Sequence, residues 1–225
     1  MNESLREILY PLGFLAALAF GLRFLLQWIT SEIEKKSVVS KGFWRLSLAG
    51  NLMLLVHSLV QSQFHVCVVQ ACNAIISWRN LNLMEPVANR VSFKAVIKML
   101  VGAVVSVLFF FIIMSSIEGT SAIEWFRLPN PGAEQIGLFW HLLGCVGLVL
   151  FSLRFWIQWW YAEKYHVSAL SLPFWWLSLV GGALSVIYFI QIADPVNVIG
   201  PAVGLIPYAR NLILMQQKSP VQANG

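Results

Sequence analysis

Charged residues are scarce in this chain of 225 residues, and their scarcity points to its class. Asp, Glu, Lys and Arg together make up 11% of the residues, whereas they make up about 25% of an average soluble domain. Hydrophobic residues make up 58%, and the mean hydropathy is +0.72. A soluble domain of this length cannot bury so much apolar surface, so the composition predicts an integral membrane protein.

Cysteine and histidine are also few, and their positions exclude several kinds of site. Cys67, Cys72 and Cys145 show neither zinc-binding nor redox spacing, and we interpret them as small core residues. The four histidines are scattered, so neither a metal nor another cofactor is expected. The chain also has no nucleophilic triad pattern, no phosphate-binding glycine loop and no soluble stretch long enough for a nucleotide-binding domain. The chain alone therefore lacks a recognisable catalytic domain.

Apolar runs that could cross a bilayer occur seven times in the sequence. A helix needs about 18–20 residues to cross, and the alternating pattern of a membrane β-barrel is absent. We therefore predict an all-α membrane protein, with a short third helix and with Pro201 and Pro207 kinking the seventh. The predicted helices cover Ile8–Ile29, Phe43–Val60, Phe64–Trp78, Val96–Ile117, Ile136–Tyr161, Leu172–Ile190 and Val196–Leu214.

The strongest pattern in the chain is an internal repeat. Residues 20–84 align without gaps onto residues 151–215, at an offset of 131 (151 − 20), and 22 of the 65 aligned pairs are identical. A repeat at a fixed offset indicates duplicated structural units. The identical pairs include polar and aromatic residues as well as apolar ones: Arg23/Arg154, Gln27/Gln158, Trp28/Trp159, Glu32/Glu163, Ser47/Ser178, Gly50/Gly181, Arg79/Arg210 and Asn80/Asn211.

The repeat predicts an architecture of three helices, one linker helix and three further helices. Four crossings separate the starts of the two triplets, so both triplets would enter the membrane in the same direction as parallel repeats. The predicted segments are a first repeat at 1–84, a linker helix with an outer loop at 85–135, a second repeat at 136–215 and a cytoplasmic tail at 216–225.

Basic residues beside the predicted spans indicate the orientation. Eleven lie on one side and only Arg6 and Arg127 on the other. The positive-inside rule makes the richer side cytoplasmic, with the N-terminus outside and the C-terminus inside. The net charge of +5 is divided among loops rather than gathered in one patch, so we do not expect nucleic-acid binding. The eleven are Lys35, Lys36, Lys41, Arg45, Arg79, Arg90, Lys94, Lys98, Lys164, Arg210 and Lys218.

Polar residues at helical spacing form the candidate site. Arginine and glutamine lie four residues apart in both copies, so each pair shares one face of its helix. A glutamate follows about one turn later, and an Arg-Asn pair ends the third helix of each triplet. We expect two similar polar clusters just inside the cytoplasmic face. The candidates are Arg23, Gln27, Arg79, Asn80, Arg154, Gln158, Arg210 and Asn211, with Glu32 and Glu163 as charge partners.

Two interpretations of these clusters remain open. An arginine at a helix centre costs roughly 2.5–3.5 kcal/mol on insertion, so it requires a partner, water or a function. The cluster is either an internal Arg–Glu or Arg–Gln network that holds a triplet together, or a site where Arg23 and Arg154 bind an anionic lipid headgroup or phosphate. Trp28 and Trp159 belong either to an interfacial aromatic belt or to the lining of a headgroup cleft. Ser47, Ser178 and the glycine pair Gly50/Gly181 predict close helix packing.

The pattern RF..QW...E....S.....FW..SL.G, followed by Arg-Asn-Leu, resembles the lipid A biosynthesis N-terminal domain family. That module occurs as small membrane proteins and fused ahead of some lipid-A-disaccharide synthases. The second copy matches more closely, with Asp194-Pro195, Gly200 and Tyr208. The three-plus-one-plus-three layout also resembles SWEET and PQ-loop transporters, although no PQ dipeptide occurs and fold likeness alone does not establish transport.

The family resemblance implies a bacterial inner-membrane protein of lipid A biosynthesis. The chain would be the membrane module of lipid-A-disaccharide synthase or its companion. It would anchor the cytoplasmic glycosyltransferase domain, fused or separate, and bind acylated glucosamine phosphate lipids. The four arginines would engage phosphate, and the glutamines and asparagines would hydrogen-bond the sugar. The alternatives are a SWEET-like transporter or lipid flippase, in which the triplets rock about a central cleft, and a purely structural anchor.

Overall fold

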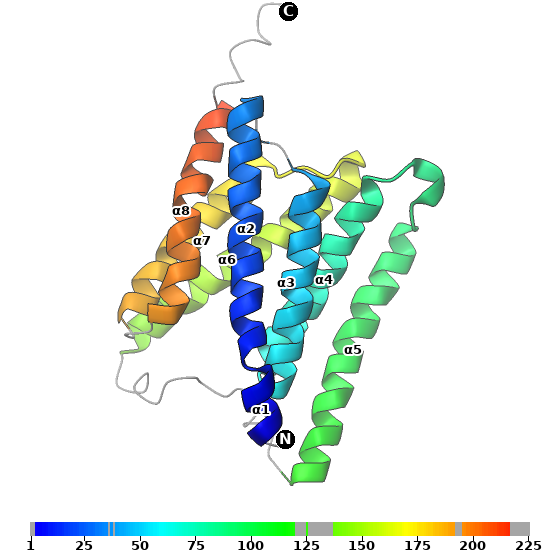
Figure 1. The fold of residues 1–225 in the computed structure, drawn as a ribbon, viewed down its shortest axis with the longest axis vertical. Coiled ribbons are helices and arrows are strands. Elements are labelled where there is room, and N and C mark those ends of the chain that lie inside the picture. Colours follow the sequence, from blue (N-terminus) through cyan, green and yellow to red (C-terminus); the bar gives the residue numbers. More distant parts are fainter. Residues whose placement is uncertain are drawn as a thin grey trace, which may run out of the picture. The chain divides into compact units, whose positions relative to one another are not determined.

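The computed structural model describes residues 3–35, 37, 39–119, 125, 137–191 and 195–216, and their elements are helices (Figure 1). This confirms the predicted all-α class. Asp194, Arg127 and Lys218 lie outside the described residues. In chain order the elements are α1 (Glu3–Leu9), α2 (Pro11–Glu34), α3 (Lys41–Val60), α4 (Phe64–Leu83), the 3₁₀ helix η1 (Val87–Asn89), α5 (Phe93–Glu118), α6 (Leu138–Tyr165), α7 (Leu172–Gln191) and α8 (Pro195–Gln216).

Six segments of the described chain are long and apolar enough to cross a membrane. Helix α4 has the length but is not among them, because polar residues such as Gln70, Asn73 and Asn80 lower its hydropathy. The seventh crossing, and with it the parallel orientation of the repeats, stays a prediction. The six segments are Glu7–Glu34, Lys41–Val60, Val87–Glu118, Leu138–Tyr165, Leu172–Gln191 and Val198–Gln216.

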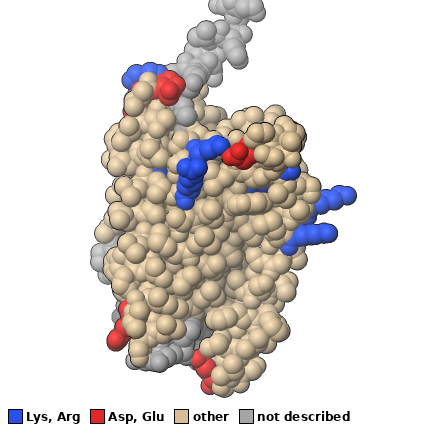
Figure 2. All heavy atoms as spheres, turned by 45° about the vertical axis from the view of Figure 1, so that its right-hand side comes forward, with Lys and Arg blue, Asp and Glu red and all other residues tan. Residues whose placement is uncertain are grey.

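The surface of the molecule suits a lipid environment. The face in Figure 2 is uncharged over most of its area, with Lys and Arg at a few places. Large apolar side chains are exposed along the helices, including Leu18 on α2, Phe109 on α5 and Val203 on α8. Such a continuous exposed apolar surface is unfavourable in water and favourable against lipid tails.

A helix extends beyond its predicted span where polar residues at its end form hydrogen bonds within the protein. Helix α4 continues to Leu83, beyond the predicted end at Trp78. The Arg79 guanidinium donates to the Asn82 side chain and to the Val91 carbonyl, both at 2.7 Å, so this polar end is satisfied inside the protein. Hydropathy alone therefore ended the predicted helix too early.

The described residues form two compact units, which divide the chain differently from the predicted repeats. The first unit contains Met1–Phe20 and Trp44–Pro129, and the second contains Gly21–Phe43 and Asn130–Gly225. Helix α2 thus contributes to both. Its second half, which carries Arg23 to Glu32, belongs to the same unit as α6, α7 and α8.

The core of the first unit forms between α4 and α5. Cys67 and Ala71 pack with Val107 and Phe111, and the rings of Phe111 and Phe64 meet edge to face at 5.3 Å. Cys67 and Cys72 are buried, as predicted for small core residues. The same prediction was wrong for Cys145, which is exposed on α6, because an apolar span in a membrane protein does not have to bury every face.

Small residues allow α6 and α7 to pack closely in the second unit. A Cβ atom on Gly181 would lie 2.7 Å from the Phe151 amide nitrogen and 3.0 Å from the Gly147 carbonyl oxygen. Ser178 is fully buried one turn earlier and donates to the Phe174 carbonyl at 2.6 Å. These contacts confirm the packing role predicted for Gly181 and Ser178.

Replacing Gly181 with alanine is expected to destabilise the protein by about 1–3 kcal/mol, because the added methyl group meets backbone atoms that cannot rotate away. Thermal unfolding in mild detergent, followed by circular dichroism, measures the change. Gly102→Ala is the control, since no atom lies within 4 Å of a Cβ at that exposed position of α5. Equal melting temperatures for the two variants would contradict the close packing.

A histidine and a tyrosine exchange places between the two copies of the repeat. In the first unit, the ring centroids of Tyr10 and His57 lie 5.5 Å apart. In the second, Tyr188 Oη and His141 Nδ1 lie 3.4 Å apart. The offset of 131 relates Tyr10 to His141 (10 + 131) and His57 to Tyr188 (57 + 131). Each pair contacts an equivalent glycine, Gly13 or Gly144, so the structural repeat extends before residue 20.

Candidate functional site

Two arginines lie buried among aromatic rings in the second unit. Arg23 on α2 is 4% exposed and Arg154 on α6 is 3% exposed, and we call them the arginine pair. Both guanidinium carbons lie near the ring of Phe155, at 5.0 and 4.8 Å from its centroid. Arg154 also lies 3.4 Å from the centroid of Phe151. Aromatic faces attract cations, and this attraction partly offsets the cost of burying the two charges.

The positive charge of Arg154 has little compensation among the residues that the structure describes. Its Nη1 donates to the Tyr208 hydroxyl at 3.2 Å, whereas its Nε is buried without a hydrogen-bond partner. No carboxylate among the described residues contacts Arg154, and the charges of the arginine pair repel each other. Burying a charge without an opposite charge is costly, so this arrangement requires an explanation.

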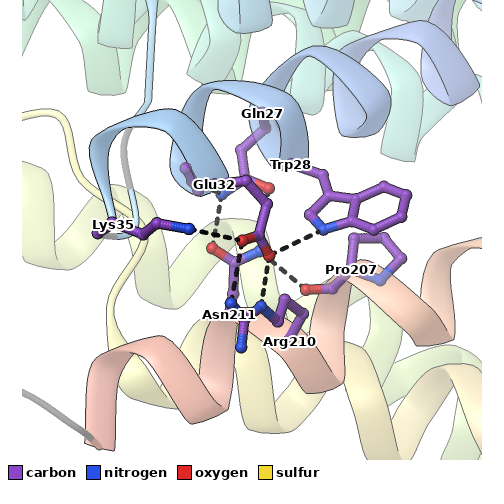
Figure 3. Close-up of polar contacts among 8 residues, drawn as sticks. Gln27, Trp28, Glu32, Lys35, Pro207, Arg210 and Asn211 are labelled. Atoms are coloured by element: carbon purple, nitrogen blue, oxygen red, sulfur yellow. Dashed lines mark hydrogen bonds and ion pairs between the residues drawn. The ribbon is translucent and has the colours of Figure 1, made fainter.

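A reciprocal amide pair joins α2 to α8. Gln27 Nε2 donates to Asn211 Oδ1 at 2.7 Å, and Asn211 Nδ2 donates back to Gln27 Oε1 at 3.1 Å (Figure 3). Gln27 also donates to Ser31, and Asn211 to the Pro207 carbonyl. Both amide side chains are almost completely buried. These bonds leave few amide donors of Gln27 and Asn211 for a sugar ligand.

An ion pair joins the same two helices nearer the end of α2. Glu32 accepts two hydrogen bonds from Arg210, one from Nε and one from Nη2, the latter at 2.9 Å. Trp28 Nε1 donates to the same carboxylate at 3.3 Å, and Lys35 lies 3.8 Å from it (Figure 3). The side chains of Glu32 and Arg210 are about one third exposed, at 32% and 34%. We call the amide pair and this ion pair together the clasp.

The positions along α2 place the arginine pair deeper than the clasp. Arg23, Gln27 and Ser31 follow at intervals of four residues, so they lie on one helical face. The partly exposed ion pair of Glu32 comes last, at the end of the helix. The clasp therefore lies between the arginine pair and the C-terminal end of α2.

This cluster combines residues of both copies of the repeat. Gln27 and Glu32 of the first copy contact Asn211 and Arg210 of the second. The sequence predicted polar clusters but did not reveal which copy would supply each residue. Residue spacing shows which side chains share one face of a helix. Which helix packs against that face depends on the tertiary structure.

Arg79, which is the first-copy equivalent of Arg210, contacts different residues. Arg79 bonds to Asn82 and to the Val91 carbonyl, so it holds the segment that connects α4 to α5. Asn80 is fully buried and donates to the Ile76 carbonyl at 2.9 Å. Arg79 and Arg210 thus occupy equivalent sequence positions but have different described partners.

The remaining predicted residues lie at the C-terminal part of α6. Gln158 is fully buried and donates to the Ala169 carbonyl at 3.3 Å. Trp159 is 7% exposed, and its Nε1 donates to Glu163 at 2.9 Å. The same Trp–Glu bond joins Trp28 to Glu32 in the other copy. The two tryptophans therefore share the role of orienting a carboxylate.

Sequence reasoning missed the aromatic surroundings of the arginine pair. Tyr208 contacts Arg154 directly, and Phe155 lies beside both guanidinium groups. One signal was present, because a phenylalanine follows the arginine in both copies, as Phe24 and Phe155. Both of these rings lie within 6 Å of a guanidinium carbon of the pair.

Comparison with known proteins identifies related sequences along almost the whole chain. The family profile described as Lipid A Biosynthesis N-terminal domain matches residues 12–82 and 143–213, which repeats the offset of 131 (143 − 12). The lipid-A-disaccharide synthases of Chlamydia pneumoniae and Chlamydia felis are 41% and 37% identical to the chain, over 96% and 95% of its length. The chain spans about a third of those relatives, 35% and 34%. No solved structure matches.

Proposed function

Because the chain belongs to the lipid A biosynthesis N-terminal domain family, we propose that it serves as the membrane module of a lipid-A-disaccharide synthase or as a companion to that enzyme. It anchors the glycosyltransferase at the membrane and presents acylated glucosamine phosphate lipids to it. The relatives that carry the name of this enzyme match 94–96% of the chain, and this observation carries the proposal.

The proposed location is the bacterial inner membrane, with the C-terminus in the cytoplasm. The six apolar helical segments support a multi-pass protein, and the eleven basic residues beside one set of helix ends support this orientation. The transferase and its soluble sugar nucleotide would then meet the membrane-bound lipid on the same side. The clasp lies toward the end of α2 that this orientation assigns to the cytoplasm, and Arg23 lies near the middle of that helix.

A flotation experiment tests the anchoring part of the proposal. The chain is reconstituted in phosphatidylcholine liposomes and mixed with the part of the Chlamydia pneumoniae synthase that lies outside the match to this chain. We expect that part to float with the proteoliposomes and to remain at the bottom of the gradient with protein-free liposomes. Equal recovery from both preparations would reject a direct anchoring role.

The same liposomes separate anchoring from the transporter alternative. An anchor leaves an acylated glucosamine phosphate in the leaflet to which it was added, whereas a flippase moves it to the other leaflet. Movement that depends on the chain, without recruitment of the synthase fragment, would favour a flippase.

A further inference from the structure

The arginine pair places two cations in one cluster, and one side of the Arg154 guanidinium group donates no described hydrogen bond. The single described hydrogen bond of Arg154 leaves from Nη1, toward Tyr208, and its buried Nε has no acceptor. In a guanidinium group, Nε and the other terminal nitrogen present parallel N–H bonds that match two oxygens of a phosphate or carboxylate. Arg154 therefore has the donor geometry of an oxyanion site, in a position almost free of water.

The described residues around Arg154 do not supply that oxyanion. The walls consist mainly of phenylalanine rings, and the Tyr208 hydroxyl is the one oxygen that a described hydrogen bond joins to Arg154. Glu32 is the carboxylate that follows Arg23 most closely in the sequence of α2, but two bonds from Arg210 already hold it. An anion from outside the chain would both use the open edge and reduce the repulsion between the two arginines.

We propose that Arg23 and Arg154 form a binding site for one terminal phosphoryl group, that is, a phosphate monoester or inorganic phosphate. Such a group carries a charge of about −1.5 to −2 near pH 7, which nearly balances two guanidinium charges. A carboxylate or a phosphodiester, with one negative charge, leaves half of the positive charge uncompensated. Charge balance thus selects monoesters over the diester headgroups of common membrane lipids.

This inference rests on the proposed function for the identity of the natural ligand and deepens it. An acylated glucosamine phosphate ends in a phosphate monoester, and its acyl chains would stay in the surrounding lipid. The clasp lies between the arginine pair and the C-terminal end of α2, so a ligand that enters from that side has to pass the hydrogen-bonded Gln27 and Asn211.

Native mass spectrometry of the purified full chain in mild detergent tests the site. The probes are phosphatidic acid, which has a monoester headgroup, and phosphatidylglycerol, which has a diester headgroup. We expect the wild-type chain to retain phosphatidic acid about tenfold more strongly, because a monoester can engage both guanidinium groups. The Arg154→Met variant is expected to lose this preference. Lys98→Met, which removes an exposed cation from α5, is the matched control and should keep it.

Competition with inorganic phosphate distinguishes the two sources of the phosphoryl group. Displacement of phosphatidic acid by phosphate would assign the site to the phosphoryl group itself, from solution or from lipid. Selective retention without displacement would assign it to a lipid headgroup. Equal retention of both lipids by the wild-type chain would overturn the proposal, and this measurement does not depend on the folding of any variant.

Failure of this site can be separated from failure of the proposed function. The flotation experiment uses phosphatidylcholine alone, so recruitment of the synthase does not require a monoester ligand. Recruitment without monoester preference would retain the anchor and reject the phosphoryl site. Monoester preference without recruitment would retain the site and reject the anchor.

Discussion

Replacing Arg154 with methionine is expected to stabilise the ligand-free chain, although most substitutions of buried residues destabilise a protein. Methionine fills a similar elongated space with apolar atoms and removes one of two charges that repel each other. Replacing a whole buried ion pair of opposite charges with apolar side chains of similar volume has stabilised proteins by roughly 1–4 kcal/mol. We expect a gain of this order in the free energy of unfolding, measured in phosphate-free detergent solution.

The charge-preserving variant Arg154→Lys provides the control. Lysine keeps the positive charge beside Arg23 but lacks the planar group that stacks on Phe151, so it should not be stabilising. A lower stability of the methionine variant would show that the ring contacts outweigh the charge repulsion. The arginine pair would then have a structural role, and charge repulsion would not favour the binding of an anion there.

Breaking the amide pair should have the second large effect, in the opposite direction. Gln27→Leu leaves the buried Asn211 side chain without its reciprocal partner, and a buried unsatisfied polar group costs about 1–3 kcal/mol. The same cost is expected for Asn211→Leu. The double variant removes both polar groups, so its loss of stability should be clearly smaller than the sum of the two single losses.

A double-mutant cycle measures this coupling from the unfolding free energies of the four proteins. The control cycle combines Gln27→Leu with Ser185→Ala, since Ser185 donates within its own helix to the Gly181 carbonyl. That second cycle should be additive within about 0.5 kcal/mol. Additivity in the first cycle as well would mean that α2 and α8 do not depend on the amide pair.

Helix positions were predictable because bilayer thickness fixes the length of an apolar span. The predicted Phe43–Val60 and Leu172–Ile190 nearly coincide with α3 and α7. The end of α4 was not predictable from hydropathy, because Arg79 and Asn80 extend the helix through specific polar partners. The position of a membrane-spanning helix follows from the average free energy of transferring its residues into the bilayer. The residue at which the helix ends depends on individual hydrogen bonds.

The candidate site was predictable in its residue types but not in its partners. The repeated arginines and amides stood out because polar side chains in apolar spans require a reason. Arg79 and Arg210 show the limit of that inference: one bonds within its own unit to the chain before α5, and the other holds Glu32. An arginine side chain determines which hydrogen-bond donors are present, but the surrounding fold determines which acceptors they reach.

The exchange of histidine and tyrosine between the copies bears on how similar the two halves of the chain are. The first copy has its tyrosine between α1 and α2 and its histidine on α3, while the second has its histidine on α6 and its tyrosine on α7. Two equivalent positions differ, yet each copy combines one imidazole, one phenol and one glycine in the same contact. The two halves are therefore more alike in structure than a count of identical letters indicates.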